Sequence, residues 1–332
     1  MIVYSEEYLK HHMEGHPEKK ERLTRTVSFL KEKGVFEKVP LKAPIRAGAD
    51  DILRVHSKDH FEEMRAKAKM GLHVVGDTYF TLHTYDAALL AAGGGLTCIK
   101  DGVRSGFALV RPPGHHATRN AAMGFCIFNN IAIGAAYARK HGYTKVAILD
   151  FDLHHGNGTQ EIFYEDDVLY ISLHQWPHYP GTGAIEETGS GKGEGYTINI
   201  PLPAGTADKG YNHALDEVVF PMLKAFEPEI LFVSAGYDGH FTDPLGGFSL
   251  SSNIYLRISR ETKGLAKKVV FALEGGYNLT ALPHCVYASL QGLFGLEGEA
   301  FDTEQSEDRK VSKSIENRIK TIRRLASEHW KV

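Results

Sequence analysis

The chain has 332 residues, of which 42% are hydrophobic and 24% are charged, and its formal net charge at pH 7 is −3. These values exclude a wholly disordered chain, a collagen-like repeat and a supercharged nucleic-acid binder. With 38 basic and 41 acidic residues there is no bulk attraction to phosphate or anionic lipid, so we expect no direct nucleic-acid binding and no membrane association.

The first residues, Met1 to Tyr4, have the pattern of a strand and not of a basic and then apolar leader. No apolar run approaches the roughly 20 residues that span a bilayer, so we expect a cytoplasmic protein. Cys98, Cys126 and Cys285 lie far apart and form no CxxC pair. They are predicted to be buried thiols, and neither a disulfide framework nor a thiolate zinc site is supported.

Short apolar and β-branched runs alternate with helical patterns along the chain. Strands are predicted at 107–110, 146–149, 168–173, 196–200, 230–233 and 269–273. Helices are predicted near 23–30, 84–100, 131–138, 208–226, 253–266 and 280–294. This alternation indicates an α/β protein of parallel βαβ units, in which both sheet faces are covered and ligands collect at the carboxyl ends of the strands.

Residues 1–298 are predicted to form a single α/β domain, and residues 299–313 are polar and charged enough to form a linker. Residues 314–332 are predicted to form an amphipathic helix. Ile315, Ile319, Ile322 and Leu325 make its apolar stripe, which we expect to dock on the body of the domain. Binding of a partner by this helix is the alternative.

Four segments that follow predicted strands end in polar residues, which are costly to bury without a purpose. They are informative only together. The segments are Arg111-Pro112-Pro113-Gly114-His115-His116, Asp150 to Gly158, Ser234-Ala235-Gly236-Tyr237-Asp238 and Glu274-Gly275-Gly276-Tyr277-Asn278.

The second segment contains alternating Asp150, Asp152 and His154, which a strand would place on one face. Two carboxylates and an imidazole at one point suit Zn²⁺ or a similar divalent ion, although a network of capped turns is the alternative. A catalytic metal needs about three protein ligands and an open position, so Asp238 is the natural additional ligand. An ordinary Asp-Gly turn with Gly239 is the alternative for Asp238.

His115 and His116 form a pair of titratable rings after a rigid Pro-Pro-Gly turn and could flank a metal-bound water. Asp150 could hold one ring and favour its charged form, while the neutral Asn157 could orient the other without raising its pKa. This difference predicts one fixed cation and one neutral base. In the fourth segment, Tyr277 could donate a hydrogen bond to an oxyanion, with a packing tyrosine as the alternative.

Together these segments resemble the histone deacetylase superfamily of metal-dependent amidohydrolases, with the pattern of its class II branch and prokaryotic relatives. Further matches occur in family order through most of the chain. They are Gly15-His16-Pro17-Glu18, Gly124-Phe125-Cys126 with Asn129-Asn130, Ser172-Leu173-His174, Pro180-Gly181-Thr182-Gly183 and Asp243-Pro244-Leu245-Gly246-Gly247.

The resemblance implies the arginase/deacetylase fold, a three-layer α/β/α sandwich around a mainly parallel sheet of about eight strands, with residues 1–298 as the catalytic domain. It also implies that zinc is bound by Asp152, His154 and Asp238, that Asp150 pairs with His115, and that Asn157 pairs with His116. His116 then removes a proton from water, charged His115 stabilises developing negative charge, and Tyr277 holds the oxyanion. The resemblance further places a structural potassium ion near Asp150, Asp152, His154, Ser172 and Leu173.

The resemblance also assigns residues to a channel for an acyl-lysine stem. Phe125, beside Gly124, and Tyr179 should form its walls, and Asp77 matches the rim aspartate that grips the substrate backbone. Arg22 is similar to an arginine of the internal product channel. Leu245 stands where the polyamine-selective type carries glutamate, so N6-acetyl-lysine in proteins is favoured as the substrate.

Three alternatives remain beside a zinc-dependent lysine deacetylase. An acetylpolyamine amidohydrolase shares the catalytic residues, and Asp77 would serve either substrate. An arginase-like hydrolase would carry further carboxylates for a two-metal centre, and a catalytically silent binder of acyl-lysine would have lost Tyr277 or a metal ligand. The metal itself could be Fe²⁺ or Co²⁺ instead of Zn²⁺, because a mixed Asp/His set accepts each of them.

Overall fold

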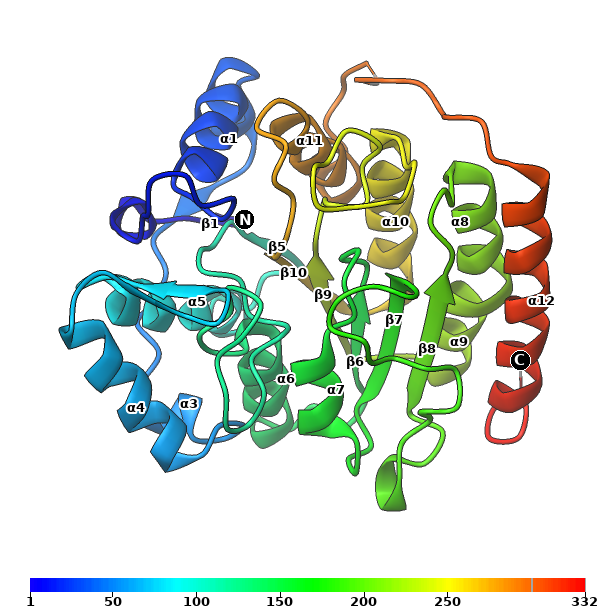
Figure 1. The fold of residues 1–332 in the computed structure, drawn as a ribbon, viewed down its shortest axis with the longest axis horizontal. Coiled ribbons are helices and arrows are strands. Elements are labelled where there is room, and N and C mark those ends of the chain that lie inside the picture. Colours follow the sequence, from blue (N-terminus) through cyan, green and yellow to red (C-terminus); the bar gives the residue numbers. More distant parts are fainter. Residues whose placement is uncertain (300, 332) are drawn as a thin grey trace.

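The computed structural model describes residues 1–299 and 301–331. Its centre is one sheet of eight strands in the order β2-β1-β5-β10-β9-β6-β7-β8, and every neighbouring pair in it is parallel (Figure 1). The strands are β1 (Ile2–Val3), β2 (Leu41–Lys42), β5 (Ser105–Ala108), β6 (Val146–Asp150), β7 (Leu169–Gln175), β8 (Thr197–Leu202), β9 (Ile230–Ala235) and β10 (Lys268–Leu273). A separate antiparallel hairpin joins β3 (His73–Val75) to β4 (Thr78–Phe80).

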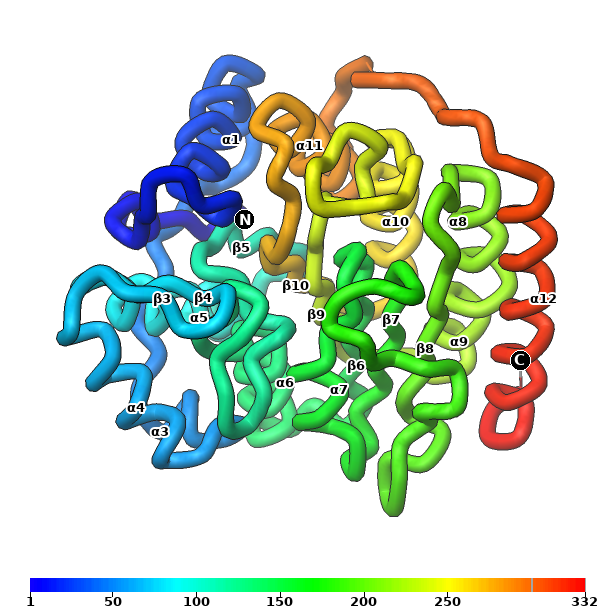
Figure 2. The backbone as a smooth tube through the Cα atoms, in the orientation of Figure 1, coloured from blue at the N-terminus to red at the C-terminus, as the bar shows by residue number. Residues whose placement is uncertain are grey.

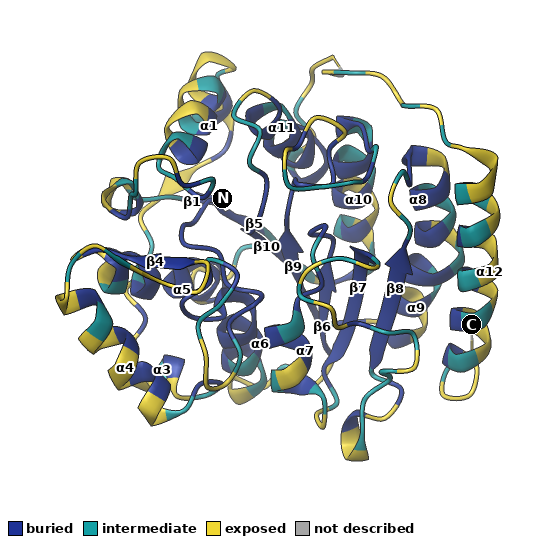
Figure 3. Ribbon diagram, in the orientation of Figure 1, coloured by how far each residue is buried: buried dark blue, intermediate teal, exposed yellow. Residues whose placement is uncertain are grey.

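Helices cover both faces of the sheet, which explains why its central strands are apolar along their whole length. One layer contains α5, α6 and α7, with α3 and α4 outside them, and the other contains α1, α8, α9, α10 and α11 (Figure 1). The bounds are α1 (Glu21–Glu32), α2 (Val35–Lys38), α3 (Ala49–Ile52), α4 (Lys58–Lys69), α5 (Thr84–Lys100), α6 (Asn130–Lys140), α7 (Asn157–Phe163), α8 (Asp208–Ala214), α9 (Phe220–Phe226), α10 (Ser252–Leu265) and α11 (Ala281–Phe294). Figure 3 shows the central strands of the sheet buried between these layers and the outward sides of α4 and α12 exposed.

The predicted α/β sandwich is confirmed, and each predicted strand overlaps an observed one. The helix predicted at 208–226 is interrupted, because a π-helical turn at Leu215–Val219 separates α8 from α9. Pro221 lies in the first turn of α9 and has no backbone N–H to donate to the preceding turn. The strand β2 and the β3-β4 hairpin were not predicted, because two- or three-residue strands carry too little periodicity.

The C-terminal helix α12 spans Arg309–Ala326, so it begins five residues before the predicted start at 314. Its N-cap is Asp308, whose side chain accepts a hydrogen bond from the backbone N–H of Lys310 at 2.7 Å. The polar connection therefore ends at Asp308, and its residue 300 lies outside the described residues. Ile315, Ile319 and Ile322 are buried, and the helix packs against β8 and α8 (Figure 1).

Residues 301–308 run from α11 to α12 across the ends of α10 and α8 (Figure 2). Two carboxylates attach this segment to the body. Oδ1 of Asp302 accepts a hydrogen bond from the N–H of Ser252 at 2.9 Å, and Oε2 of Glu307 accepts from the N–H of Gly210 at 3.1 Å. Both contacts lie at helix N-termini, where negative charge is favoured. Within the described residues, no helix has the length and apolar character needed to cross a membrane.

Candidate active site

The four polar segments follow β5, β10, β9 and β6, which are neighbours in the sheet. Because these strands are parallel, their carboxyl ends lie at the same end of the sheet, where ligands of open α/β sheets bind. The strand β6 ends at Asp150, so Asp152 and His154 lie in the loop after it and not in a continued strand. We expected a strand to place Asp150, Asp152 and His154 on one face, and this is wrong in detail. Asp150 contacts His115, whereas the loop places Asp152 and His154 near Asp238.

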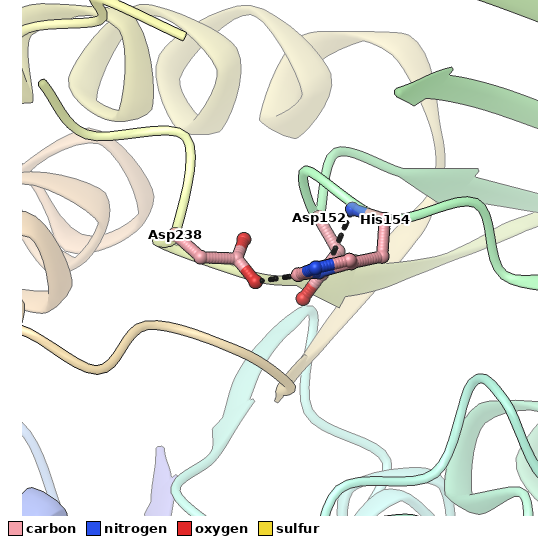
Figure 4. Close-up of side chains that lie close together, drawn as sticks. All are labelled: Asp152, His154 and Asp238. Carbon is pink, nitrogen blue, oxygen red and sulfur yellow. Dashed lines mark hydrogen bonds and ion pairs between the residues drawn. The ribbon is translucent and has the colours of Figure 1, made fainter. Parts of the chain in front are cut away.

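Asp152, His154 and Asp238 converge on one point (Figure 4). Each offers a ligand atom, and these atoms all lie within 4.8 Å of one another. Nδ1 of His154 lies 3.2 Å from Oδ1 of Asp152 and 3.0 Å from Oδ2 of Asp238. All three are buried or nearly so, and the backbone N–H groups of Leu153 and Gly275 hold the outer oxygens of Asp238 and Asp152.

The residues present fit a divalent metal ion. Two carboxylates and one imidazole nitrogen are ligands that Zn²⁺ accepts, and fewer than four protein ligands leave positions for water and substrate. The surrounding backbone is shaped to this cluster, because a Cβ at Gly236 would overlap the Asp152 carboxylate and a Cβ at Gly275 would overlap that of Asp238. Oxygen and nitrogen donors of this kind also suit Fe²⁺ or Co²⁺.

The electrostatics of these three residues show how strongly the cluster attracts positive charge. Burial opposes a charged imidazole, but hydrogen bonds to Asp152 and Asp238 outweigh burial and raise the pKa of His154 to about 10. Burial and the adjacent Asp152 carboxylate together raise the pKa of Asp238. Two buried carboxylates therefore compete for the same counter-charge, which a divalent ion would supply.

The two adjacent histidines have different partners. Nδ1 of His115 donates to Oδ2 of Asp150 at 3.0 Å, and Nδ1 of His116 donates to Oδ1 of Asn157 at 2.8 Å. The amide of Asn157 is oriented by a second contact, from Nδ2 to Sδ of Met123 at 3.4 Å. Each imidazole is thus held at Nδ1. Nε2 of His115 lies 3.8 Å from Oδ1 of Asp152, and Nε2 of His116 is left for chemistry.

The partners give the two rings opposite charge preferences. Burial disfavours the charged form of His115, but the carboxylates of Asp152 and Asp150 outweigh it and raise the pKa to about 10. Burial lowers the pKa of His116 well below its usual value, and the nearby His115 and His154 rings lower it further. The structure therefore places a cationic imidazole beside a neutral one.

Tyr277 lies in the turn after β10. Its backbone N–H donates to Oδ2 of Asp243 at 2.6 Å, and its ring packs edge-on against Phe125 with 5.8 Å between centroids. The guanidinium of buried Arg22 lies 5.0 Å from the centre of the Tyr277 ring. Burial raises the pKa of Tyr277 well above its usual value, so its hydroxyl keeps the proton it would donate.

A narrow cavity of about 140 Å³ leads to this group of residues. Its lining contains every predicted channel residue together with catalytic and metal candidates. The lining residues are Asp77, His116, Gly124, Phe125, His154, Tyr179, Leu245 and Tyr277. A larger surface groove of about 860 Å³ reaches Asn157 from outside but includes none of the metal-binding candidates.

The rim and one wall of the cavity are joined through the β3-β4 hairpin. Oδ1 of Asp77, in the hairpin turn, accepts from the N–H of Gly124 at 2.9 Å, and the Thr78 hydroxyl accepts from the N–H of Phe125 at 3.1 Å. Phe125 has φ of 67°, a left-handed conformation that is rare for a bulky residue. These two bonds hold Phe125 in that conformation against the cavity.

The expected potassium site is brought together only in part by side chains. Asp150 and Ser172 are partners in register on β6 and β7, with Leu173 next along β7. The Ser172 hydroxyl lies 2.9 Å from Nδ1 of His174. The potassium ion stays a prediction.

Several buried charged residues near the site lie in the segments named above, but the sequence did not indicate what they do. Glu274, at the end of β10, accepts backbone hydrogen bonds from Gly114 and His115. Glu18 is buried between Arg22 and Arg111 and binds both. Asp243 holds the backbone of Tyr277. For Glu274, its position beside Gly275 and Gly276 was the one sign of a role in the sequence, but its partners Gly114 and His115 come from a distant part of the chain.

Comparison with known proteins agrees with this geometry. A family model described as histone deacetylase domain matches residues 16–293. A "Probable deacetylase" of Archaeoglobus fulgidus is 40% identical over 99% of this chain and 98% of its own length. "Histone deacetylase 10, chloroplastic" of Oryza sativa subsp. japonica is 40% identical over 86% of this chain and 71% of its own.

Among solved structures, the HD domain of HDA15 superimposes with a TM-score of 0.90 and 34% sequence identity, covering 99% of this chain and 95% of that one. The predicted arginase/deacetylase fold is thereby confirmed. The fold, the family match and relatives named as deacetylases agree with one another. The chain belongs to the histone deacetylase family and is a hydrolytic deacetylase.

Proposed function

We propose that the protein is a zinc-dependent deacetylase that hydrolyses the acetamide of N6-acetyl-lysine in proteins, releasing lysine and acetate. The observation that carries the proposal is the narrow cavity, because its lining combines the exposed Asp77 with the buried or half-buried His116, His154 and Tyr277. A slender chain with a terminal acetamide fits this lining, with Asp77 as the acceptor for its backbone and the buried groups around the acetamide.

Asp152, His154 and Asp238 would hold the metal ion. When bound there, a divalent ion supplies Lewis-acid polarisation of the amide carbonyl and acidifies water. The remaining chemistry falls to side chains around the cavity.

His116 is the proposed general base, because it faces the cavity and its ring stays neutral. Its free Nε2 takes a proton from the attacking water and later returns one to the departing amine. Asn157 keeps the ring in the tautomer with the proton on Nδ1, so that Nε2 is the accepting nitrogen.

His115 and Tyr277 are proposed to stabilise the negative charge that develops on the substrate. His115 is held charged by Asp150 and Asp152, and its positive charge lies beside His116 with 4.0 Å between ring centroids. The Tyr277 hydroxyl, which keeps its proton, donates a hydrogen bond to the oxyanion. Phe125 and Tyr179 flank the methylene stem and exclude water from it.

An acetylated polyamine is the second candidate substrate, and one observation favours it. Asp77 is exposed at the rim and could attract a cationic chain as well as a peptide backbone. Leu245 argues for the protein substrate, because it lines the cavity with an apolar side chain where a carboxylate would select a cation. The proposal also includes a structural potassium ion near Ser172. It includes a cytoplasmic location as well, although two plant relatives are named as chloroplastic.

The test is acetate release by the purified, zinc-loaded protein from an acetyl-lysine peptide and from N-acetylated polyamines, measured side by side. Preference for the peptide supports the proposal, and preference for a polyamine overturns the assignment of Leu245. Hydrolysis of neither compound by protein with one bound metal ion per chain would contradict the proposed substrate class.

A further inference from the structure

Glu274 occupies a buried position that joins several parts of the site. It follows β10, which lies between β5 and β9 in the sheet, and its side chain is fully buried. Oε2 accepts hydrogen bonds from the backbone N–H groups of Gly114 at 2.6 Å and His115 at 3.1 Å. The Ser234 hydroxyl, at the end of β9, donates to Oε1 at 3.4 Å.

The turn that Glu274 binds offers little freedom of its own. Two consecutive N–H groups that converge on one oxygen form an anion-binding concavity. Gly114 cannot be replaced in this turn without movement, because a Cβ there would overlap the backbone of Asn130 and Phe128. The carboxylate therefore holds the amino side of the histidine pair, while the N–H groups of Gly158 and Thr159 hold the His115 carbonyl, both at 3.1 Å.

The residues after Glu274 are bound to the rest of the site. The N–H of Gly275 donates to Oδ2 of Asp152 at 2.8 Å, and Tyr277 follows two residues later. Arg22 donates to the carbonyl of Glu274 at 2.6 Å and to that of Gly276 at 2.7 Å, and these two bonds fix the turn. One short segment thus contacts the histidine pair, a metal-binding candidate and the oxyanion donor.

We propose that Glu274 is a positioning residue that fixes the His115–His116 pair relative to Asp152 and Tyr277. The inference rests on the proposed hydrolysis, because the alignment matters for proton transfer at His116. Glu274 binds the backbone of Gly114 and His115 and does not line the cavity, so its removal changes the placement of the base without removing a group that the substrate touches. A displacement of about 1 Å in a reacting group lowers turnover by roughly 100-fold.

The test compares Glu274→Ala with Glu274→Gln and with a control, Asp208→Ala. The amide of Glu274→Gln keeps an oxygen for both N–H groups and turns its nitrogen toward Ser234. Asp208 is also a buried carboxylate that accepts a backbone hydrogen bond, from Ser251 at 2.7 Å, but it begins α8 outside the site. Metal content and secondary structure are measured for every variant.

We expect Glu274→Ala to lower kcat roughly 100-fold with KM within about 3-fold and with unchanged metal content. Glu274→Gln should restore kcat to within about 3-fold of the wild type, and Asp208→Ala should leave kcat at the wild-type value. A merely structural role would predict equal effects in the two alanine variants. Wild-type kcat in Glu274→Ala, or a loss that only follows metal content, would overturn the proposal.

A crystal structure of the variant separates this inference from the proposed function. In Glu274→Ala the contacts of His115 with Asp150 and of His116 with Asn157 should lengthen or break, and an unmoved pair would contradict the proposal even if the wild type hydrolysed neither substrate. If Glu274→Ala does not fold, Glu274→Asp replaces it. Its shorter side chain cannot reach both N–H groups, so an unmoved pair with wild-type kcat in that variant is equally decisive against the role.

Discussion

Nδ1 of His116 donates a hydrogen bond to the neutral side-chain oxygen of Asn157 at 2.8 Å. The adjacent ring, His115, donates from the same atom to the carboxylate of Asp150 at 3.0 Å. The carboxylates of Asp152 and Asp150 favour the charged form of His115, whereas His116 has only an amide partner and is kept neutral by burial and by the nearby rings of His115 and His154. This difference is the physical basis for dividing base and cation between them.

Asn157→Asp should move the pH dependence of turnover toward higher pH. Burial and the charges of His115 and His154 hold the pKa of His116 well below its usual value, so the base is free of its proton even in mildly acidic solution. A carboxylate at position 157 favours the protonated ring and raises that pKa, so activity is lost at a higher pH as the solution is acidified. The profile of kcat/KM between about pH 5 and about pH 9 checks this. An unmoved acidic limb would contradict the assignment of His116 as the base.

Tyr277→Phe should lower kcat by roughly 10²- to 10³-fold, because it removes one hydrogen-bond donor to the oxyanion. The ring contact with Phe125 and the backbone bond to Asp243 do not involve the hydroxyl, so the fold and metal content should be retained. Acetate release and thermal unfolding of the same preparation measure both. Near-normal turnover in the variant would exclude the hydroxyl from the reaction.

Asp238→Asn should abolish tight metal binding. An amide carries no charge and leaves the Nδ1 of His154 with one carboxylate instead of two. We expect elemental analysis after dialysis to find about one divalent ion per wild-type chain and almost none per variant chain, since a single-metal catalytic site uses about three protein ligands. Two ions per wild-type chain would instead favour the arginase-like alternative.

The free energy of unfolding should fall as the pH drops below about 6.5, in part because of His56. Its Nε2 accepts from the N–H of Asn129 at 2.9 Å and its Nδ1 donates to the carbonyl of Thr118 at 2.9 Å, so the buried ring is neutral. Burial, together with the neighbouring His60 ring, lowers its pKa to about 3. The unfolded chain binds this proton below about pH 6.5 and the folded chain does not, so each such group removes about 1.4 kcal/mol per pH unit until about pH 3.

Urea unfolding of wild type and His56→Gln at several pH values measures this contribution. The variant should be less stable at neutral pH, because the ring's packing is lost. As the pH falls, however, its free energy of unfolding should decrease less steeply, because about one proton fewer is bound on unfolding. Equal slopes for the two proteins would show that His56 does not bind its proton on unfolding.

Ile319→Ala should destabilise the protein by about 2 to 4 kcal/mol, because the side chain is buried where α12 packs on the body. The neighbouring Lys320 is exposed, and Lys320→Ala should change the free energy of unfolding by less than about 0.5 kcal/mol. Denaturant unfolding of both variants makes the comparison. Equal, small effects would mean that α12 detaches from the domain in solution.

Long local patterns were enough to predict most of the fold. The strands β6 and β9 are continuous apolar runs, and α5 and α11 are long windows with helical composition, so each could be recognised without its neighbours. The strand β2 is two residues long and exposed, and its assignment depends on its pairing with β1. The start of α12 was misplaced because residues 309–313 are mostly polar, although Asp308 was a usable capping signal.

For the site, the sequence indicated which segments carry chemistry but not how they meet. The spacing of Asp152 and His154 is local, and so is the adjacency of His115 and His116. The contact of Glu274 with His115 spans 159 positions, and that of Arg22 with Gly276 spans 254. The first depends on β5 and β10 being neighbours in the sheet although they are far apart along the chain, and the second depends on the packing of α1 beside α11.

The sheet has two open edges, and they differ in their exposure to other molecules. One edge is β2, which is short and carries Lys42, a feature that discourages pairing with a foreign strand. The other edge, β8, has the sequence Thr-Ile-Asn-Ile-Pro-Leu, in which all six residues are buried, and it is covered by α12, with Arg318 donating to the carbonyl of Pro201 at 2.8 Å. Removing residues 309–332 would therefore uncover the buried side chains and the edge of β8. Pro201, which has no N–H to donate, would then be left to oppose pairing with a foreign strand, so such a fragment should be more prone to associate through that edge even while its catalytic residues remain in place.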